Sequence, residues 1–356
     1  MQTPKFINAS KTSFYQELKT RVNDYFEAKG KEKTGGQALY IKAGILFSAY
    51  IAVYVHLVFF TPPAFWALLE CLLMGALTAA IGFNVMHDGS HGSFSSNRFF
   101  NFVAEYSSNI LGASGIMWKN KHVIIHHTYT NIDGVDDDIE IKPMLRMCKT
   151  QKRYAIHRFQ HIYVWFLYTL LLLIWLFFTD YKKYFTQKVG SVPIKKMSTW
   201  DHIAFWIAKV GYAIMMIALP IYMVGFLPWL AGFLSMALFA GFILSIVFQL
   251  AHTVEETDFP IPNDEVHIEN EWAIHQLETT ANFATRNRVI SWLVGGLNFQ
   301  VEHHLFPKIS HIHYPAISKI IRETCEEFNV RYIEYKRMRH ALVSHASYLK
   351  RMGREE

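Results

Sequence analysis

The chain has 356 residues, of which 51% are hydrophobic and 15% aromatic, while only 18% are charged. This composition is too apolar for an ordinary soluble protein of this length, and three scattered cysteines exclude a disulfide framework or a CxxC metal site. The formal net charge of +6 is modest, and we expect the lipid bilayer, but no nucleic acid, among the partners of the chain.

Five apolar stretches approach the roughly 20 residues that a helix needs to cross a bilayer. The first lacks the short apolar run and the small-residue cleavage site of a secretory signal, so we interpret it as a span of the mature protein. The five stretches are Ala43–Phe60, Ala64–Phe83, Tyr163–Thr179, Ile203–Val224 and Trp229–Phe248.

The distribution of Lys and Arg predicts the orientation of these stretches. Basic residues are frequent before the first stretch, on both sides of the third and after the fifth, whereas the connectors 61–63 and 225–228 carry none. By the positive-inside rule the two uncharged connectors face outward and the remaining connections face the cytoplasm. The chain is therefore expected to form two helical hairpins, Ala43–Phe83 and Ile203–Phe248.

The stretch Tyr163–Thr179 does not fit this arrangement as a fifth crossing. If it crossed, the five lysines between Tyr181 and Lys196 would lie outside, and the membrane would separate histidines on its two sides. We therefore predict an interfacial or re-entrant segment. The expected fold is an all-α integral membrane protein with four transmembrane helices in two hairpins, this interfacial or re-entrant helix and a cytoplasmic helical cap. The expected divisions are a cytoplasmic N-terminal segment (1–40), a membrane domain (41–331) and a basic cytoplasmic tail (332–356).

Histidine is unusually frequent, with 18 in the chain, and two clusters follow the second span. In "NVMHDGSHGSF", His87 and His91 are four residues apart and lie on one face of a continuing helix. In "WKNKHVIIHHTYTN", His122 and His126 repeat this spacing, and His127 is expected to point elsewhere around the helix. An isolated pair of this kind is more often structural than metal-binding, so the clusters gain weight only together.

Three further histidines complete the pattern. His252 in "FQLAHTVEE" lies within about one helical turn of the end of the last span, and "NFQVEHHLFP" supplies His303 and His304. All four groups lie at or near the same membrane face, and their eight imidazoles exceed the four to six donors that one transition metal accepts. The sequence therefore predicts two metal ions. Imidazole suits zinc, copper, nickel and iron, so the ligand type alone does not select the metal.

Acidic residues beside these clusters are candidates to complete the metal coordination or to orient the imidazoles. They could equally be solvated acids on a cytoplasmic surface. The candidates are Asp88, Asp136, Asp138, Glu255, Glu256 and Glu302.

The three boxes HDGSH, HVIIHH and QVEHH, in this order around a membrane hairpin, resemble the membrane-bound fatty acid desaturase family. The phrases "WKNKHVIIHHTYTNIDGVDDD", "QLAHTVEE", "HQLETTANFATRN" and "GGLNFQVEHHLFPKISHIHYP" resemble its front-end branch, of which delta-6 acyl and sphingolipid delta-8 desaturases are examples. The resemblance covers nearly the whole chain from about Tyr40 to Arg331. It implies insertion of a cis double bond between an existing one and the carboxyl end of a long acyl chain.

The resemblance also implies the cofactor and its ligands. It implies a di-iron centre that uses O2 and two external electrons for each turnover. Gln300 begins the third box where other desaturases have histidine, which matches the front-end branch, and His252 falls where the family has an additional ligand. The implied metal ligands are His87, His91, His122, His126, His127, His252, Gln300, His303 and His304.

The electron donor is expected to be a separate protein. Many front-end desaturases carry a fused cytochrome b5 domain with an HPGG motif, and the segment Met1–Gly36 is too short for one and lacks the motif. A ferredoxin or a free cytochrome b5 would serve, and a basic cytoplasmic surface would attract such an acidic donor. This reading favours a bacterial inner membrane, with the active site on the cytoplasmic face.

The substrate is expected to be a long-chain acyl-CoA or an acyl lipid. An apolar tunnel for it could be walled by Trp118, Phe248, Trp272, Trp292 and Phe299, although ordinary packing is an alternative for each.

The basic tract that follows residue 332 could bind CoA phosphates or anionic lipid. It contains Lys336, Arg337, Arg339, Lys350 and Arg351.

Two other functions fit parts of the pattern. A hydroxylase or ketolase of the same histidine-box superfamily would use a similar site, and product analysis separates it from a desaturase. A zinc or iron transporter would need polar residues at mid-span. The histidine clusters lie beyond the predicted spans, with only His56 inside one, so transport is disfavoured.

Overall fold

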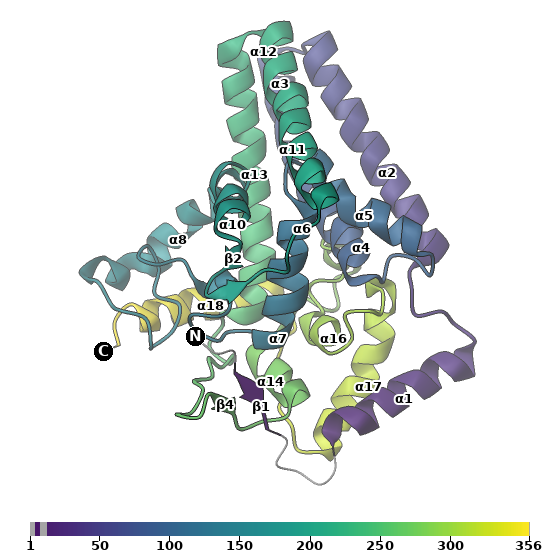
Figure 1. Ribbon diagram of the computed structural model, residues 1–356, viewed down its shortest axis with the longest axis vertical. Helices are drawn as coiled ribbons and strands as arrows, with labels where there is room; N and C mark the ends of the chain where they lie inside the picture. The colour runs from purple at the N-terminus through teal and green to yellow at the C-terminus, as the bar shows by residue number, and fades with distance from the viewer. Residues whose placement is uncertain (1–3, 8–12, 356) are drawn as a thin grey trace.

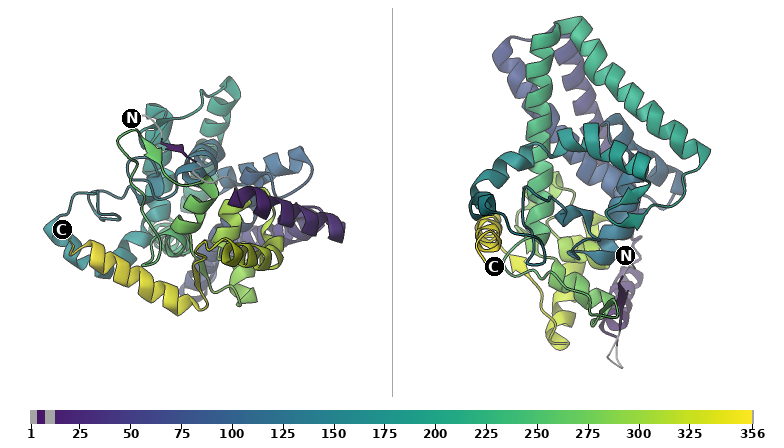
Figure 2. Two further views of the ribbon diagram at one scale, coloured as in Figure 1. Left: turned by 90° about the horizontal axis from the view of Figure 1, so that it is seen from below. Right: turned by 60° about the vertical axis from the view of Figure 1, so that its left-hand side comes forward.

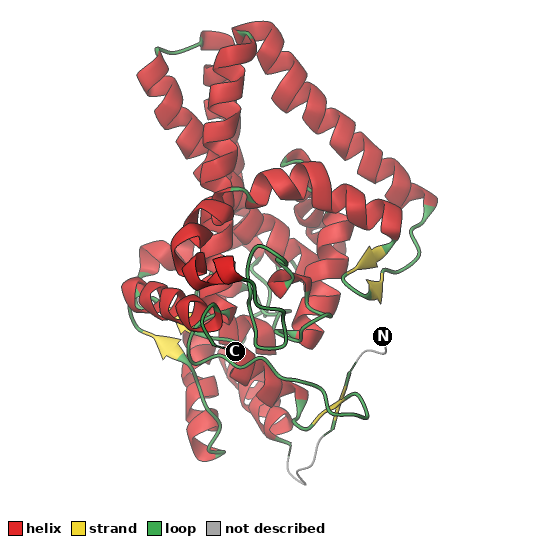
Figure 3. Ribbon diagram, turned by 90° about the vertical axis from the view of Figure 1, so that its left-hand side faces the viewer, coloured by secondary structure: helices red, strands yellow, loops and turns green. Residues whose placement is uncertain are grey.

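Helices dominate the part of the chain that the computed structural model describes, residues 4–7 and 13–355. Of the expected N-terminal segment, residues 1–3 and 8–12 lie outside the described ranges. Short strands form three two-stranded pairs, which lie among the loops (Figure 3). Parallel pairs join β1 (Lys5–Phe6) to β4 (His267–Ile268) and β5 (Asn282–Phe283) to β6 (Glu334–Tyr335), and an antiparallel pair joins β2 (Lys188–Val189) to β3 (Val192–Pro193).

Among the described residues, four helices are long and apolar enough to cross a membrane, and they contain the four stretches that the sequence predicted as spans (Figure 1). Each extends beyond the apolar stretch seen in the sequence, because helical backbone continues into polar residues that hydropathy does not detect. They are Gly36–Phe60, Ala64–His91, Thr199–Val224 and Phe226–His252.

Three of these helices contain short π-helical turns. The first comprises α2 (Gly36–Val55) and η1 (His56–Phe60). The second comprises α3 (Ala64–Ile81), η2 (Gly82–Met86) and α4 (His87–His91). The third comprises α11 (Thr199–Ala213), η7 (Ile214–Ala218) and α12 (Leu219–Val224), and the fourth is the single helix α13 (Phe226–His252).

Close backbone contact holds α3 against α13. A Cβ atom added to Gly75 would lie 2.5 Å from the carbonyl oxygen of Met236, so no larger residue fits without a shift of the helices. The facing residues Ala237 and Ala240 are fully buried. Small residues at such crossings let helices approach closely, which is how spans associate where lipid removes the hydrophobic driving force.

The fifth apolar stretch of the sequence forms a bent pair of helices. Its first arm contains η5 (Ala155–Phe159) and α8 (Gln160–Thr169), and its second contains α9 (Leu171–Ile174), η6 (Trp175–Thr179) and α10 (Asp180–Thr186). The arms meet at 60°, the geometry of a broken span or of a re-entrant loop. The pair packs on α13, where a Cβ atom on Gly241 would lie 2.4 Å from the carbonyl oxygen of Thr169.

The shorter helices gather at one end of the long ones (Figures 1 and 2). A hydrophobic core there includes Phe14, Leu18, Ala273, Val301 and Ile317. These side chains come from α1 (Phe14–Lys29), α14 (Trp272–Thr279), α16 (Gln300–Leu305) and α17 (Tyr314–Glu327). We call this end of the molecule, with the loops between these helices, the cap.

The remaining short helices lie beside the long ones. They are α5 (Arg98–Ile110), α6 (Gly115–Trp118), η3 (Lys119–His126), α7 (His127–Tyr129), η4 (Asp137–Ile139), α15 (Arg288–Leu293), η8 (His311–His313) and α18 (Met338–Met352). The last of these, α18, packs along α8 of the bent pair.

A buried ion pair fixes the bent pair to the third long helix. The ammonium of Lys209 lies 2.7 Å from Asp180 Oδ2 and 2.7 Å from the carbonyl oxygen of Gly112. The same carboxylate accepts the backbone N–H of Ser114 at 2.8 Å and the indole N–H of Trp175 at 3.0 Å. Since Ser114 is the N-cap of α6, this carboxylate also positions the segment that leads into the second histidine box.

We expect Lys209→Met to lower the free energy of unfolding by about 3–5 kcal/mol, because it leaves the Asp180 carboxylate buried without its cation. The measurement is the thermal unfolding of the detergent-purified protein. Lys182→Met, at an exposed position of α10, is the control and should change little. Addition of Asp180→Asn should restore part of the loss, and a double variant no more stable than the single one would contradict this account.

Candidate metal centre

The first histidine box lies at the end of the second long helix. In the π-helical turn η2 before it, the backbone N–H of His87 bonds to the carbonyl oxygen of Gly82, five residues earlier. The box itself is the single helical turn α4, and His87 and His91 place their rings 4.7 Å apart, as the four-residue spacing predicted. Both side chains are buried.

The second box forms a π-helix, η3, and this changes the expected direction of His127. The backbone N–H of His127 bonds to the carbonyl oxygen of His122. An i→i+5 turn brings residues five apart onto one face, whereas an α-helical turn would separate them. The expectation that His127 points elsewhere is therefore wrong: its Nε2 lies 3.3 Å from Nε2 of His122.

The third box is the short helix α16, whose residues are all buried. Its adjacent histidines point to different groups. The ring of His303 lies 4.4 Å from that of His87, and the ring of His304 lies 4.3 Å from that of His127. His252, the last residue of α13, lies 4.8 Å from His304.

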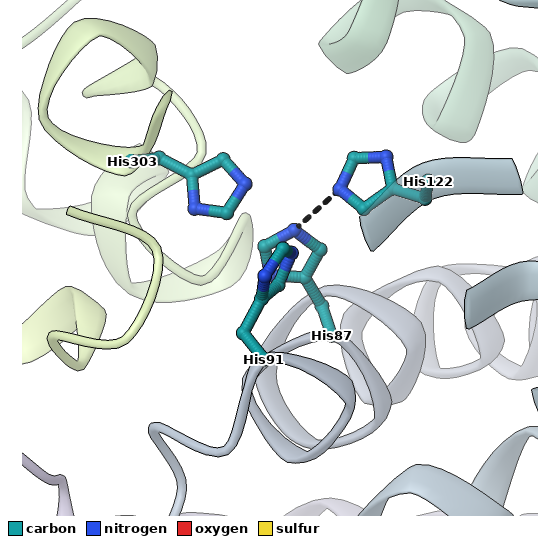
Figure 4. Close-up of side chains that lie close together, drawn as sticks. All are labelled: His87, His91, His122 and His303. Atoms are coloured by element: carbon teal, nitrogen blue, oxygen red, sulfur yellow. Dashed lines mark hydrogen bonds between the residues drawn. The ribbon is translucent and has the colours of Figure 1, made fainter. Parts of the chain in front are cut away.

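The predicted histidines thus meet in two adjoining clusters. In each, one ligand atom per residue lies within 4.8 Å of the others. The first cluster is His87, His91, His122 and His303, whose rings converge from three segments of the chain (Figure 4). The second cluster is His126, His252 and His304.

His127 lies between the clusters. Its ring is 4.6 Å from that of His91 and 4.3 Å from that of His304, so it faces one member of each. All eight predicted histidines are therefore brought together, although they come from four parts of the chain.

Gln300 lies in the second cluster. Its side-chain amide nitrogen is 3.0 Å from Nε2 of His252 and 3.5 Å from Nε2 of His304, and its amide oxygen is buried without a hydrogen-bond partner. The two amide atoms are exchanged by rotation about the last side-chain bond. One rotation therefore directs a carbonyl oxygen, a usable metal ligand, at the same point as the two imidazoles.

Hydrogen bonds fix the orientation of the second cluster. In each of its imidazoles, Nδ1 forms a hydrogen bond with an oxygen atom outside the cluster. His126 donates to Asp136 at 3.0 Å, His252 donates to the carbonyl oxygen of Thr279 at 3.1 Å, and His304 donates to Gln276 Oε1 at 2.7 Å. With the proton held at Nδ1, the lone pair at Nε2 of each ring is directed into the cluster.

The electrostatics of the site also suit metal binding. Burial, together with the neighbouring imidazoles, lowers the pKa of the four histidines of the first two clusters' surroundings that lie outside the long helices well below the usual range, which keeps them neutral at pH 7: His122, His127, His303 and His304. Nε2 of His91, His126 and His303 is buried without any hydrogen-bond partner. Neutral, buried and unpartnered nitrogens are the donor set that a transition metal ion would satisfy.

The acidic candidates divide into three kinds. Asp136 and Asp138 approach His126 Nδ1 at 3.0 and 3.3 Å; burial opposes protonation, but these carboxylates outweigh it and raise the pKa of His126. Glu255 and Glu256 are exposed, so of the two alternatives given for the acidic residues, that of solvated surface acids holds for this pair.

Asp88 and Glu302 are buried next to ligand candidates but bind other groups. Asp88 Oδ2 is bonded to His311 at 2.9 Å, while its Oδ1 lies 3.8 Å from Nδ1 of His87. Glu302 accepts hydrogen bonds from Asn282 and Tyr332 at 2.8 and 2.7 Å, and its burial raises the pKa of its carboxyl to about 7.

Sequence reasoning missed several of the supporting groups. Gln276, Tyr314 and His311 lie within phrases that carried the family resemblance, but no spacing rule distinguishes them from ordinary polar residues. The hydroxyl oxygen of Tyr314 lies 3.1 Å from Nδ1 of His303. Their roles depend on contacts between segments far apart in the chain.

Aromatic rings cover one side of the first cluster. Trp118 stacks on His122 with ring centroids 4.6 Å apart, and Phe248 lies 6.0 Å from the same imidazole. Trp272 donates its indole N–H to the carbonyl oxygen of His127, and Phe299 is buried beside α16. Trp292 differs from the other predicted wall residues because it is 44% exposed.

The fold and the site are those of an integral membrane protein whose clustered histidines have the donors for metal. The sequence pattern of the fatty acid desaturase family matches residues 61–336. The chain is 36% identical to the sn-1 linoleoyl-lipid 6-desaturase of Arthrospira platensis, over 99% of this chain and 95% of that protein. It is also 36% identical to the sn-1 linoleoyl-lipid 6-desaturase of Synechocystis sp., over 97% and 96%. The acyl-lipid (8-3)-desaturase of Physcomitrium patens is 36% identical over 99% of this chain and 74% of its own length. The chain belongs to the fatty acid desaturase family and is an oxidoreductase of the front-end type.

His345 supports the end of α13 from the far side. Its Nε2 lies 2.7 Å from the hydroxyl of Tyr168, and its Nδ1 donates to the carbonyl oxygen of Thr253, next to His252, at 2.6 Å. Burial lowers the pKa of His345 to about 4. This side chain therefore ties α18, α8 and α13 together in its neutral form.

We expect acid to weaken this junction. The unfolded chain protonates His345 near pH 6.5 and the folded chain only near pH 4, so its contribution to stability is present above pH 6.5 and is lost as the pH falls between these values. In this window His345 should lower the free energy of unfolding by about 1.4 kcal/mol for each pH unit of acidification, and His345→Gln should lack this contribution. Thermal melts at pH 7 and pH 5 measure the difference, and His340→Gln, at an exposed position of α18, is the control. Equal acid dependence of His345→Gln and the native protein would contradict this assignment.

Proposed function

We propose that this chain is an acyl-lipid desaturase that introduces a double bond on the carboxyl side of an existing one, in a linoleoyl chain held as a lipid. The observation that carries this proposal is the pair of adjoining histidine clusters, buried at one end of four long apolar helices. The activity by which the Arthrospira platensis and Synechocystis sp. relatives are named supports the lipid-linked linoleoyl substrate and the 6 position.

Two iron ions would be held by the two clusters. One would be bound by His87, His91, His122 and His303, and the other by His126, His252, His304 and Gln300. His127 lies within reach of either ion. Bound iron would supply the activation of O2 that removal of hydrogen from an unactivated methylene requires, since no acid–base side chain can perform that step.

The protein itself positions the reacting groups. The hydrogen bonds at Nδ1 hold the second cluster in one tautomer. Trp118 and Phe248 present an apolar surface beside His122, against which a methylene chain would lie without displacing polar contacts. Burial of the whole centre keeps bulk water from the reacting carbons.

The proposed membrane arrangement follows from the charges. The two uncharged connectors would lie outside, so the cap and the metal centre would face the cytoplasm, with the bent pair re-entering from that side. The long helices would form two hairpins, and a bacterial inner membrane is the expected location. Ferredoxin or free cytochrome b5 would donate electrons, attracted by the basic residues of 332–356.

We expect two separately held ions to be lost separately. His91→Ala and His252→Ala should each reduce bound iron from about two ions per chain to about one, because each removes a donor from a different cluster. Elemental analysis of the iron-loaded purified protein measures this, with exposed Glu256→Ala as the control. Loss of all iron from either single variant would contradict two separately held ions.

The activity is tested by the fatty acid profile of a host that expresses the protein. The host would be fed linoleate and supplied with ferredoxin and its reductase, and its lipids would be analysed by gas chromatography–mass spectrometry. We expect a new polyunsaturated fatty acid with its added double bond nearer the carboxyl end, and no such product from the His303→Ala, His304→Ala double variant. A hydroxylated product from the native protein would refute desaturation.

A further inference from the structure

A cavity of about 270 Å³ lies between the two pairs of long helices, at the end away from the histidine clusters. The first pair contributes residues from η1 and α3, and the second contributes residues from η7, α12 and α13. The walls include Leu57, Cys71, Met74, Met216, Trp229 and Met236.

The walls offer almost no polar atoms to a ligand. The lining residues include no charged side chain; Thr61 lies at an exposed position, and the polar side chains of Trp229, Ser235 and Tyr54 are bonded to backbone. Trp229 donates its indole N–H to the carbonyl oxygen of Met216 at 2.8 Å, Ser235 donates to Ala231 at 2.8 Å, and the hydroxyl of Tyr54 bonds to the carbonyl oxygen of Met215. A cavity of this kind excludes water and accepts apolar molecules; one of about 150 Å³ is enough for benzene.

The cavity is separate from the metal centre. Below it, Gly75 of α3 meets the backbone of Met236 so closely that no side chain fits between them. From Gly75 the helix runs twelve further residues to His87, roughly 18 Å at 1.5 Å per residue. The space around the metal ligands therefore does not continue into this cavity between α3 and α13.

The cavity is continuous with the surface that faces lipid. Leu68, in its wall, is 47% exposed, and Ala64 and Ala231 of opposite helix pairs are also exposed. These residues belong to helices long and apolar enough to span the bilayer, so lipid chains would lie outside the opening. The helical turns η1 and η7, which contribute residues to the cavity wall, are π-helical, and such turns occur often at functional sites.

We infer that this cavity is a binding site for the alkyl tail of a bilayer lipid that is not the lipid undergoing reaction. The inference goes beyond desaturation and depends only on the position of the long helices in the membrane. A tail seated there fills the gap between the two helix pairs, whose opposite ends carry His91 and His252. It would therefore stabilise the relative position of those pairs without entering the metal centre.

The test is photochemical labelling in vesicles of phosphatidylcholine. The probe is a phosphatidylcholine that carries a diazirine near the methyl end of a saturated acyl chain, and labelled peptides are mapped by mass spectrometry. We expect labelling concentrated on the peptides that contain Cys71, Met74, Met216 and Met236. Even labelling along all lipid-facing helix surfaces would overturn the inference.

Filling the cavity provides the matched comparison. Ala67→Phe places a ring in the cavity from the first helix pair, and Ala231→Phe does so from the second. Each should abolish the concentrated labelling, whereas Leu69→Phe, at a lipid-facing position outside the cavity, should not. Iron content, which is set at the other end of the helices, should stay at the native value and shows that the variants fold. Unchanged labelling in both filling variants would overturn the inference.

A competition arm identifies the source of the tail. Excess linoleoyl lipid and excess saturated lipid of the same headgroup should reduce labelling equally, because a general lipid site does not distinguish them. Selective displacement by the linoleoyl lipid would assign the cavity to the substrate and overturn the inference. Failure of desaturase activity alone would leave the labelling pattern unchanged, so the two proposals fail independently.

Discussion

The fold buries many imidazoles close together, and several of their ring nitrogens have no hydrogen-bond partner. The rest of the structure depends on this arrangement. A buried polar atom that lacks a partner costs on the order of 1–3 kcal/mol. Nε2 of His91 and His303 in the first cluster and Nε2 of His126 in the adjoining second cluster are such atoms. Protein packing alone gives no reason to collect them there. Metal coordination is the interaction that would offset this cost, and the surrounding elements can be understood as the means of bringing the donors to one place.

Two local departures from α-helical geometry accomplish much of this convergence. A π-helical turn precedes the first box, and another forms the second. The second one has the larger effect, because it turns His127 toward His122 and allows three imidazoles of a single segment to face the centre. Outer contacts then hold each ring: Asp136, Gln276 and the carbonyl oxygen of Thr279 take the Nδ1 protons of the second cluster. These acceptors come from different parts of the chain, so the orientation of the rings is a property of the folded cap as a whole.

The extent to which the sequence predicts this molecule follows from the range of each interaction. Hydropathy identifies the four long helices because about 20 apolar residues in a row carry that information locally. Spacing within the boxes identifies the histidines for the same reason. The direction of His127 was not predictable from an α-helical period, since the π-helix is a tertiary outcome. Gln276, Tyr314 and the pair of Asp180 with Lys209 were missed because each acts on a partner at least 11 positions away in sequence. Glu255 and Glu256 lie close to His252 in sequence, but both are exposed, so proximity in sequence does not bring their carboxylates to the site.

Glycine places α13 in direct backbone contact with two neighbours, at Gly75 with α3 and at Gly241 with the bent pair. A crossing without an intervening side-chain layer has little room to slide, because any rotation drives main-chain atoms together. This contact therefore restricts the distance between the end of the second long helix, where α4 carries the first box, and the end of α13, which carries His252. Parting these two helices would therefore be a costly route for an acyl chain to the metal centre, because their backbones are already in contact.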